Sequence, residues 1–220
     1  MRYHKWPLQG KGTINASYTY DLYSEDGYRT DIRTETIDHS ATTYDWDNMP
    51  MTNASSWSDY QKTQVATLMR NVGYAFPAIY GAGATEYTFG SVPANVLNCF
   101  DYKVQTVITG NNPGVSNAIN DINEWLGYLK SSLDNECPIP YEAKNSGSGD
   151  ARHMFVVDGY TTNNYFHFNF GWSGGSNGWF TISAVTPSQG DNYSWTATGA
   201  KHRAVINFEP NKIVTVSVAA

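Results

Sequence analysis

Two residues in the second half of the chain are of types that can carry out acid–base chemistry together. His153 opens the apolar stretch His-Met-Phe-Val-Val-Asp, and Asn169 stands near the end of the aromatic stretch Tyr-Phe-His-Phe-Asn-Phe. A side-chain amide can accept a hydrogen bond from one imidazole nitrogen, which fixes the ring and leaves the other nitrogen to face a reactive thiol. A histidine and an asparagine in this relation suit Cys-His-Asn chemistry. Taken alone, the spacing favours two ordinary hairpin residues, and the flanking motifs described below favour the catalytic interpretation.

The two stretches are expected to be neighbouring strands of one hairpin. If the turn centres on Thr161, antiparallel pairing places His153 directly opposite Asn169, with Cα atoms about 4.5 to 5.5 Å apart. Because side chains alternate along a strand, Phe155 should lie on the His153 side and Met154 on the other.

Three helices are expected to support these strands. A capping box, Ser58-Asp-Tyr-Gln61, precedes apolar residues at helical spacing that end near Gly73. A second helix is expected to open at Asn112-Pro113 and to present one apolar face as far as Leu133. A shorter helix is expected from Ser91 to Phe100.

After Cys137 the sequence changes to short runs separated by turn residues, which is typical of a β-meander or small barrel. The loop Lys144 to Asp150 is expected to be flexible, and Gly174 to Gly178 carries an Asn-Gly turn signal. The expected strands are Ile139 to Ala143, His153 to Asp158, Tyr165 to Phe170, Trp179 to Ala184 and Arg203 to Phe208. Helices followed by clustered strands predict an α+β fold.

Composition limits the class of function. The chain of 220 residues has a formal charge of −6, and no run of Lys and Arg suits it to nucleic acid. No stretch is long and apolar enough to span a bilayer. Aromatic and charged residues each make up 15% of the chain, a mixture that suits a β-rich extracytoplasmic protein, although no export signal is recognisable.

The cysteines and histidines do not suggest a metal site. Cys99 and Cys137 are too few for a disulfide scaffold, and whether they pair is left open. The five histidines form no HxxxH or HxH set. No metal and no other cofactor is expected.

Five motifs in order give the chain a resemblance to a known family, the streptopain group of bacterial cysteine peptidases, which have the papain-like fold. The resemblance extends to about Pro210. The motifs are Met1-Arg-Tyr-His-Lys-Trp-Pro7, Tyr44-Asp-Trp-Asp-Asn-Met-Pro50, Leu68-Met-Arg-Asn-Val-Gly73, His153 to Tyr160, and Phe166-His-Phe-Asn-Phe-Gly-Trp-Ser-Gly-Gly175.

The resemblance implies a role for each site residue. His153 would be the catalytic base and Asn169 its orienting partner. Trp172 would shield the pair from water, and Phe170, which stands where the family usually has Trp, would keep an aromatic wall. Arg152 replaces the usual glycine before the histidine, so it adds charge at the substrate-binding side of the base.

The family's nucleophile is not recognisable in this chain. It belongs to a Gly-Cys-Val-Ala-Thr-type segment that would precede Met1, and the oxyanion-hole glutamine would lie earlier still. Cys99 falls near the end of a short helix, where the macrodipole disfavours a thiolate, and Cys137 has no recognisable activating neighbour. We therefore expect residues 1 to 210 to be a partial peptidase domain, inactive without the upstream cysteine, and residues 211 to 220 to be a tail or the start of another domain.

Two other functions stay open at this stage. A domain that has lost its nucleophile would bind peptides or another protein, and an aromatic-rich β module would bind glycans. For the peptidase, the resemblance implies polypeptide substrates, a pro-segment or inhibitor outside this chain, and a secreted or cell-surface location.

Overall fold

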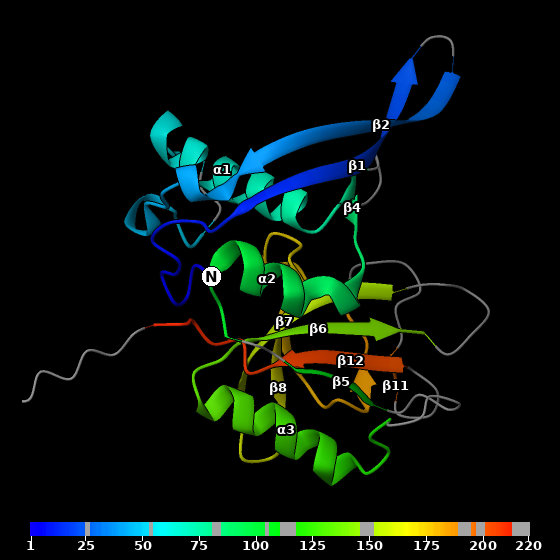
Figure 1. Cartoon of the computed structure of the whole chain (residues 1–220). Coiled ribbons are helices and arrows are strands. Elements are labelled where there is room, and N and C mark those ends of the chain that lie inside the picture. Colours follow the sequence, from blue (N-terminus) through cyan, green and yellow to red (C-terminus); the bar gives the residue numbers. More distant parts are fainter. Residues whose placement is uncertain are drawn as a thin grey trace, which may run out of the picture. The chain divides into compact units, whose positions relative to one another are not determined.

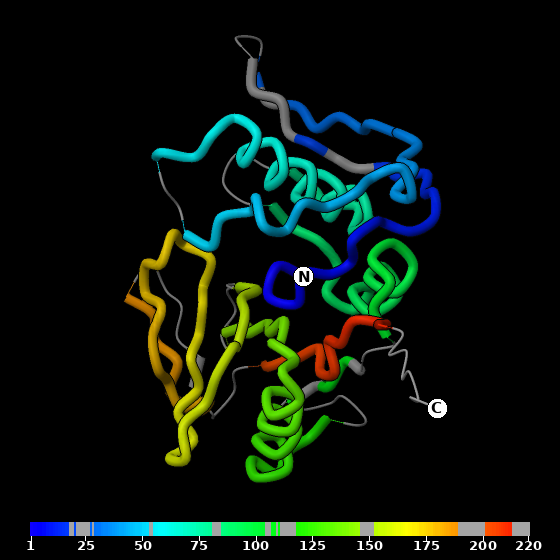
Figure 2. The backbone as a smooth tube through the Cα atoms, turned by 90° about the vertical axis from the view of Figure 1, so that its left-hand side faces the viewer, coloured from blue at the N-terminus to red at the C-terminus, as the bar shows by residue number. Residues whose placement is uncertain are grey.

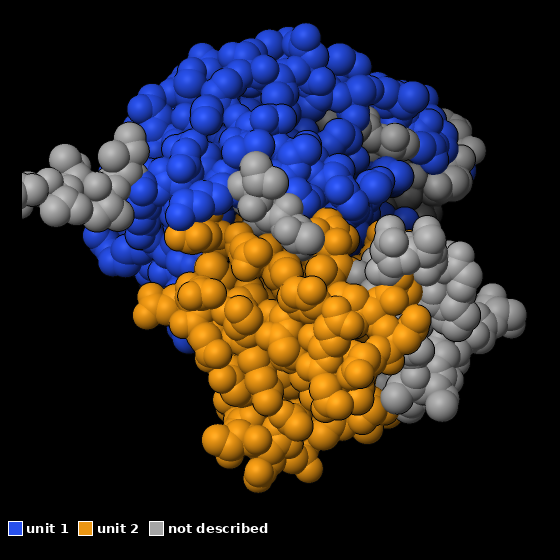
Figure 3. All heavy atoms as spheres, turned by 60° about the horizontal axis from the view of Figure 1, so that its bottom comes forward, with its two compact units in different colours: residues 1–103, 210–220 blue, residues 104–209 orange. Residues whose placement is uncertain are grey.

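The structure, a computed structural model, describes residues 1–24, 27–52, 55–80, 85–103, 106–110, 118–145, 152–188, 195–196 and 201–212. The chain divides into two units, which are coloured separately in Figure 3. Unit 1 comprises Met1–Lys103 and Pro210–Ala220, and unit 2 comprises Val104–Glu209. The candidate residues 152, 153, 169, 170 and 172 all belong to unit 2.

A long hairpin dominates the sheet of unit 1 (Figure 1). Strands β1 (Thr13–Ser24) and β2 (Gly27–Asp38) pair antiparallel, and the sheet order is β2-β1-β3-β4, with β3 at Ile79–Tyr80 and β4 at Thr85–Glu86. This hairpin was not predicted. Among the described side chains, Ala16 and Ile37 provide its buried apolar contacts, so the alternation that identifies a half-buried strand is weak.

The helices of unit 1 follow the sequence signals closely. Helix α1 (Asp59–Ala75) has the predicted capping box, in which the Gln61 amide donates to Ser58 Oγ over 3.2 Å and the Ser58 amide to Gln61 Oε1 over 3.0 Å. Helix α2 (Val92–Phe100) lies where a short helix was expected. Three short 3₁₀ helices span His39–Ala41, Trp46–Asn48 and Phe89–Ser91.

Unit 2 is built on a six-stranded sheet of order β5-β12-β6-β7-β8-β9, with antiparallel neighbours throughout. A separate pair, β10 with β11, is also antiparallel. The strands are β5 (Thr106–Gly110), β6 (Ile139–Lys144), β7 (Arg152–Tyr160), β8 (Phe166–Asn169), β9 (Gly178–Phe180), β10 (Ala184–Val185), β11 (Trp195–Thr196) and β12 (Lys201–Ile206). Four of the five expected strands are present with shifted ends, whereas the expected strand Trp179 to Ala184 is divided into β9 and β10 by residues 181–183. Residues 146–150 of the expected flexible loop lie outside the described residues.

Helix α3 (Ile122–Asp134) packs on this sheet but begins later than predicted. Its N-cap is Asp121, whose Oδ1 accepts hydrogen bonds from the amides of Asn123 and Glu124 over 2.7 and 3.3 Å. A carboxylate that satisfies two free amides is a stronger start signal than the Asn112-Pro113 pair, and residues 111–117 lie outside the described residues.

Aromatic side chains fill the core of unit 2. Tyr141, Phe155, Phe166, Phe168 and Phe170 are each at most 5% exposed, and Trp125 and Leu129 of α3 close the core. Large aromatic residues contribute most of the apolar surface buried in such a core. The core therefore holds β7 and β8 rigidly at the place where the candidate residues lie.

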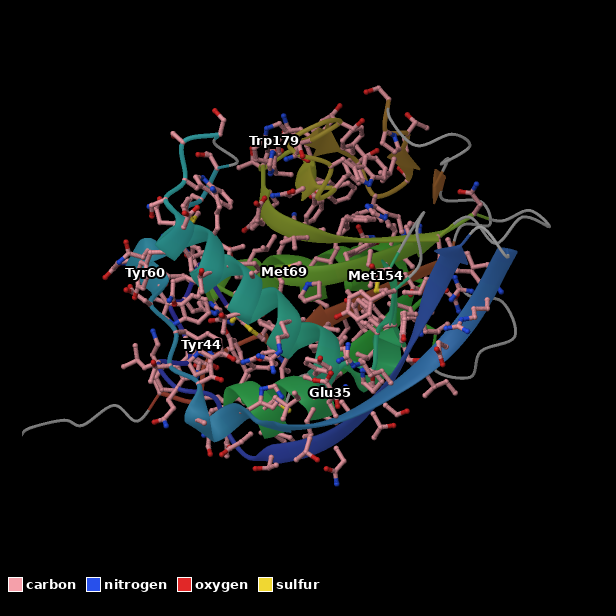
Figure 4. The ribbon with its side chains drawn as sticks, turned by 90° about the horizontal axis from the view of Figure 1, so that it is seen from above. Glu35, Tyr44, Tyr60, Met69, Met154 and Trp179 are labelled. Atoms are coloured by element: carbon pink, nitrogen blue, oxygen red, sulfur yellow. The ribbon has the colours of Figure 1, made fainter. Side chains whose placement is uncertain are left out.

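The β7–β8 hairpin is seen as the pair of long yellow strands in Figure 2. Met154 of β7 is partly exposed and Trp179 of the next strand, β9, is exposed; both are labelled in Figure 4. Within the described part of the chain, no helix is long and apolar enough to cross a membrane.

Candidate active site

His153 lies on the inner, core-facing side of β7. It pairs with Ala143 of β6, and Phe155, two residues further along β7, is buried in the same core. Val156 is 39% exposed and lies on the opposite side. The predicted division of β7 into two faces is therefore confirmed.

The predicted register of the hairpin is wrong. Asn169 pairs with Val156, not with His153. Opposed residues share a face, so Asn169 lies on the exposed side of the sheet, whereas His153 lies on the inner side. A side-chain pair formed directly across the two strands is thus not what the structure shows.

A main-chain carbonyl bonds the imidazole instead. His153 Nε2 lies 2.8 Å from the carbonyl oxygen of Phe170, the residue that follows β8. A carbonyl can only accept a hydrogen bond, so in the neutral ring Nε2 carries the proton and Nδ1 carries the lone pair. The Phe170 carbonyl thereby selects one tautomer of the ring, in which Nδ1 can accept a hydrogen bond or a proton.

Aromatic rings surround the imidazole. Trp172 stacks on it with ring centroids 4.5 Å apart and an interplanar angle of 24°, and Phe170 stacks on Trp172 at 5.3 Å and 16°. Burial lowers the pKa of His153, while the hydrogen bond to the Phe170 carbonyl acts in the opposite direction and has the smaller effect. Burial therefore favours the neutral form of the imidazole over the charged form.

The loop between β8 and β9 presents the Phe170 carbonyl. The Phe170 amide donates to Asn177 Oδ1 over 3.0 Å, and the Gly171 amide donates to Asn169 Oδ1 over 3.1 Å. Gly171 has φ +78°, a left-handed conformation that glycine adopts without strain. The peptide group that contains this carbonyl and the peptide group before it are thus each held by an asparagine side chain.

Asn177 contacts the candidate site through the Phe170 amide, whereas from sequence it was expected only as part of the turn Gly174 to Gly178. Its Asn-Gly pair does mark the turn into β9, but the contact of its side chain with Phe170 has no sequence signature of its own. Arg152, the residue before His153, begins β7, pairs with Lys144 and is exposed. Its part in substrate binding stays a prediction.

Both cysteines are buried thiols. Cys99 lies in the last turn of α2, and burial raises the pKa of its thiol. Cys137 is 2% exposed, and its thiol donates to the carbonyl oxygen of Asn135 over 3.3 Å. Neither environment favours the thiolate form that a nucleophile needs.

Most of the chain matches a known protein family. The sequence profile of the peptidase C10 family matches residues 1–180. The chain belongs to the peptidase C10 family. It is thus a member of a family of cysteine peptidases, and the resemblance to streptopain-type peptidases is confirmed.

Individual relatives of the C10 chain are thiol proteases. Streptopain of Streptococcus pyogenes is 29% identical over 188 residues, which cover 86% of this chain and 44% of that protein. The thiol protease/hemagglutinin PrtT of Porphyromonas gingivalis is 29% identical over 217 residues, 96% of this chain and 22% of that protein. The chain therefore spans less than half the length of these relatives.

Among solved structures, the active wild-type interpain A cysteine protease of Prevotella intermedia resembles this chain with a TM-score of 0.71 and 28% identity, over 93% of this chain and 77% of that one. A prointerpain A fragment of the same organism gives a TM-score of 0.66 and 27% identity. The α+β, papain-like fold expected from the sequence is confirmed.

Proposed function

We propose that this C10 chain supplies the general base of a cysteine endopeptidase, and that the nucleophilic thiolate comes from residues outside the 220-residue chain. The observation that carries the proposal is the position of His153, whose Nε2 is bonded to the Phe170 carbonyl and whose ring is stacked on Trp172. This combination sets the tautomer and limits the access of water to the ring.

The proposed mechanism uses both nitrogens of His153. Nδ1 accepts the proton of the attacking thiol, which gives a thiolate and an imidazolium. The positive ring keeps its bond to the Phe170 carbonyl, because Nε2 donates in both protonation states. Nδ1–H then protonates the leaving amine as the acyl-enzyme forms, and water completes hydrolysis.

Asn169 takes a different part in this proposal from the one first expected. Through Oδ1 it holds the Gly171 amide, so it supports the loop that carries the Phe170 carbonyl. It is a positioning residue that acts through the main chain. Trp172 and the Phe170 ring provide the aromatic wall.

Substrates and setting follow from the same proposal. The substrates are polypeptides. Arg152 is exposed and lies on the face of β7 opposite His153, so in this proposal it contacts a part of the substrate that lies away from the base. A secreted or cell-surface location and control by a pro-segment or inhibitor belong to the proposal as well.

The source of the nucleophile gives the first test. The 220-residue chain is expected to hydrolyse no peptide above background, and an epoxide cysteine-protease inhibitor should label neither Cys99 nor Cys137, because both are buried. A longer form that includes the coding sequence upstream of Met1 should react with the inhibitor at a cysteine before Met1. Mass spectrometry of the labelled peptides locates the modified residue.

Two outcomes would count against this assignment. Turnover with labelling at Cys99 or Cys137 would place the nucleophile within the chain. A longer form with no reactive cysteine would favour a domain that binds peptides without cutting them.

A second test concerns the support of the Phe170 carbonyl. Asn177→Ala should lower kcat/KM of the longer form by roughly 10- to 100-fold, because small displacements at an active site have effects of this size. Asn177→Asp keeps an oxygen acceptor for the Phe170 amide and should retain most of the activity. Asn169→Ala should cost less than His153→Ala, because it loosens the loop without removing the base.

A spectroscopic measurement separates positioning from general stability. In the 220-residue chain, the ring ¹⁵N shifts of His153 should show protonated Nε2, and Asn177→Ala should mix the tautomers. If Asn177→Ala lowers the melting temperature but leaves the tautomer unchanged, Asn177 serves stability and does not position the base.

A further inference from the structure

A cavity of about 380 Å³ lies beside the amino-terminal end of α3, within unit 2. Ile119, Ile122 and Ile182 form apolar walls, together with Trp125. The Trp125 ring packs so closely on Gly110 that a Cβ there would lie 2.9 Å from it, so glycine at this position allows the indole to lie on β5. The cavity is thus formed by the packing of α3 on β5.

Two side chains that line this cavity, Trp125 and His202, each have a buried nitrogen without a hydrogen-bond partner among the described residues, Nε1 and Nε2 respectively. His202 of β12 lines the cavity and is 3% exposed. Its Nδ1 lies 2.9 Å from the hydroxyl of Tyr141, whereas its Nε2 has no hydrogen-bond partner among the residues that the structure describes. An unpaired polar atom in such surroundings is costly, and a suitable ligand atom removes that cost.

The ring of His202 presents a donor. Burial lowers its pKa to about 4, so the ring is neutral at pH 7 and has one N–H and one lone pair. When the Tyr141 hydroxyl donates to Nδ1, the proton of the ring is on Nε2. The matching ligand atom is therefore a hydrogen-bond acceptor such as a carbonyl oxygen.

The opening of the cavity disfavours a negative ligand. Asn120, Asp121 and Ser183 contribute polar groups there, and the Asp121 carboxylate already caps α3. An anion would be repelled by this carboxylate.

We propose that this cavity is a binding site for an uncharged, mainly apolar small molecule that carries a carbonyl oxygen, with the oxygen bonded to His202 Nε2 and the apolar body between the isoleucines and Trp125. A cavity of about 150 Å³ holds benzene, so one of about 380 Å³ accommodates a fused two-ring body. The site is distinct from His153 and does not depend on the proposed peptidase function.

The test compares two probes of nearly equal shape. 1-Indanone has a ketone oxygen, and indane has the same fused rings without it. Titration of the full 220-residue chain, followed by the methyl signals of the cavity isoleucines and the indole N–H signal of Trp125, should show saturable binding of both. 1-Indanone should bind about five- to tenfold more tightly, the gain of one hydrogen bond to a buried donor.

Two variants localise the effect. His202→Asn keeps an oxygen that can accept from the Tyr141 hydroxyl and removes Nε2. In this variant 1-indanone and indane should therefore bind with about equal affinity. Ile119→Trp fills the cavity from a partly exposed position and should abolish binding of both probes. Circular dichroism establishes that each variant is folded.

Three results would overturn the proposal. They are absence of saturable binding to the folded wild-type chain, equal affinity of the two probes, and signal changes that persist in Ile119→Trp. If His202→Asn does not fold, Ile119→Trp and the two-probe comparison on the wild-type chain still decide the matter.

Discussion

Replacement of His153 by alanine is expected to abolish peptide hydrolysis, with a loss in kcat/KM of about 10⁴-fold or more. In the proposed mechanism the imidazole is required twice, since Nδ1 removes the thiol proton and then protonates the leaving amine. The ring is also the group on which the Phe170 carbonyl and Trp172 converge. The measurement is steady-state hydrolysis of a peptide substrate by the longer form that contains the upstream cysteine.

His167→Ala provides a matched control. His167 lies on the neighbouring strand β8, where its Nδ1 is 2.6 Å from Asp158, and the side chain is partly exposed. Because it does not belong to the proposed machinery, its loss should change kcat/KM less than about threefold. Comparable losses in both variants, or substantial activity of His153→Ala, would contradict the assignment of the base.

Acid is expected to destabilise the protein through His202, by about 3 kcal/mol between pH 6.5 and pH 4. The folded-state pKa of this imidazole is about 4, because burial disfavours its charged form, whereas the unfolded chain titrates near the ordinary value of 6.5. Between these values the unfolded state binds more protons, so stability rises with pH. The contribution is fully present above pH 6.5 and decreases as the pH falls toward 4.

Urea unfolding at several pH values measures this effect. His202→Asn removes the titrating group, so the pH dependence of its unfolding free energy should be flatter than that of the wild type by about 3 kcal/mol over this interval. Identical pH profiles for wild type and His202→Asn would show that His202 does not couple folding to protonation.

The two faces of β7 and the start of α1 could be predicted from sequence because each depends on residues that are close together in the sequence. The alternation along β7 places Phe155 and His153 on one side. The capping box of α1 needs only Ser58 and Gln61. Such signals are local, and the tertiary structure does not override them.

The register of the β7–β8 hairpin depended on features that no local pattern reveals. The loop between the strands is closed by the Thr161 amide, which donates to the Tyr165 carbonyl over 2.8 Å, so the turn is not centred on Thr161. An irregularity between Val157 and Gly159 then shifts the pairing again. Together these changes move Asn169 opposite Val156.

The partner of the imidazole could not be predicted for a different reason. Residue types identify side-chain donors and acceptors, whereas every residue has a main-chain carbonyl. Which carbonyl reaches His153 depends on the conformation of the loop that begins at Phe170 and is held by Asn177. The assumed hairpin register and the family resemblance therefore pointed to a side-chain amide, that of Asn169, as the partner of His153.

Use of a main-chain acceptor makes the orientation of the base insensitive to the identity of the side chain at position 170. Replacing Phe170 alters the aromatic wall but leaves its carbonyl oxygen in place, so an alanine scan would overlook this oxygen. A chemical change in the backbone can expose its role. Semisynthesis with an ester in place of the peptide bond between Phe170 and Gly171 would weaken the carbonyl as an acceptor and leave every side chain unchanged. The same replacement removes the Gly171 amide that donates to Asn169 Oδ1. One atom exchanged for another would therefore weaken two hydrogen bonds, the one from the imidazole to the carbonyl and the one from the loop to Asn169.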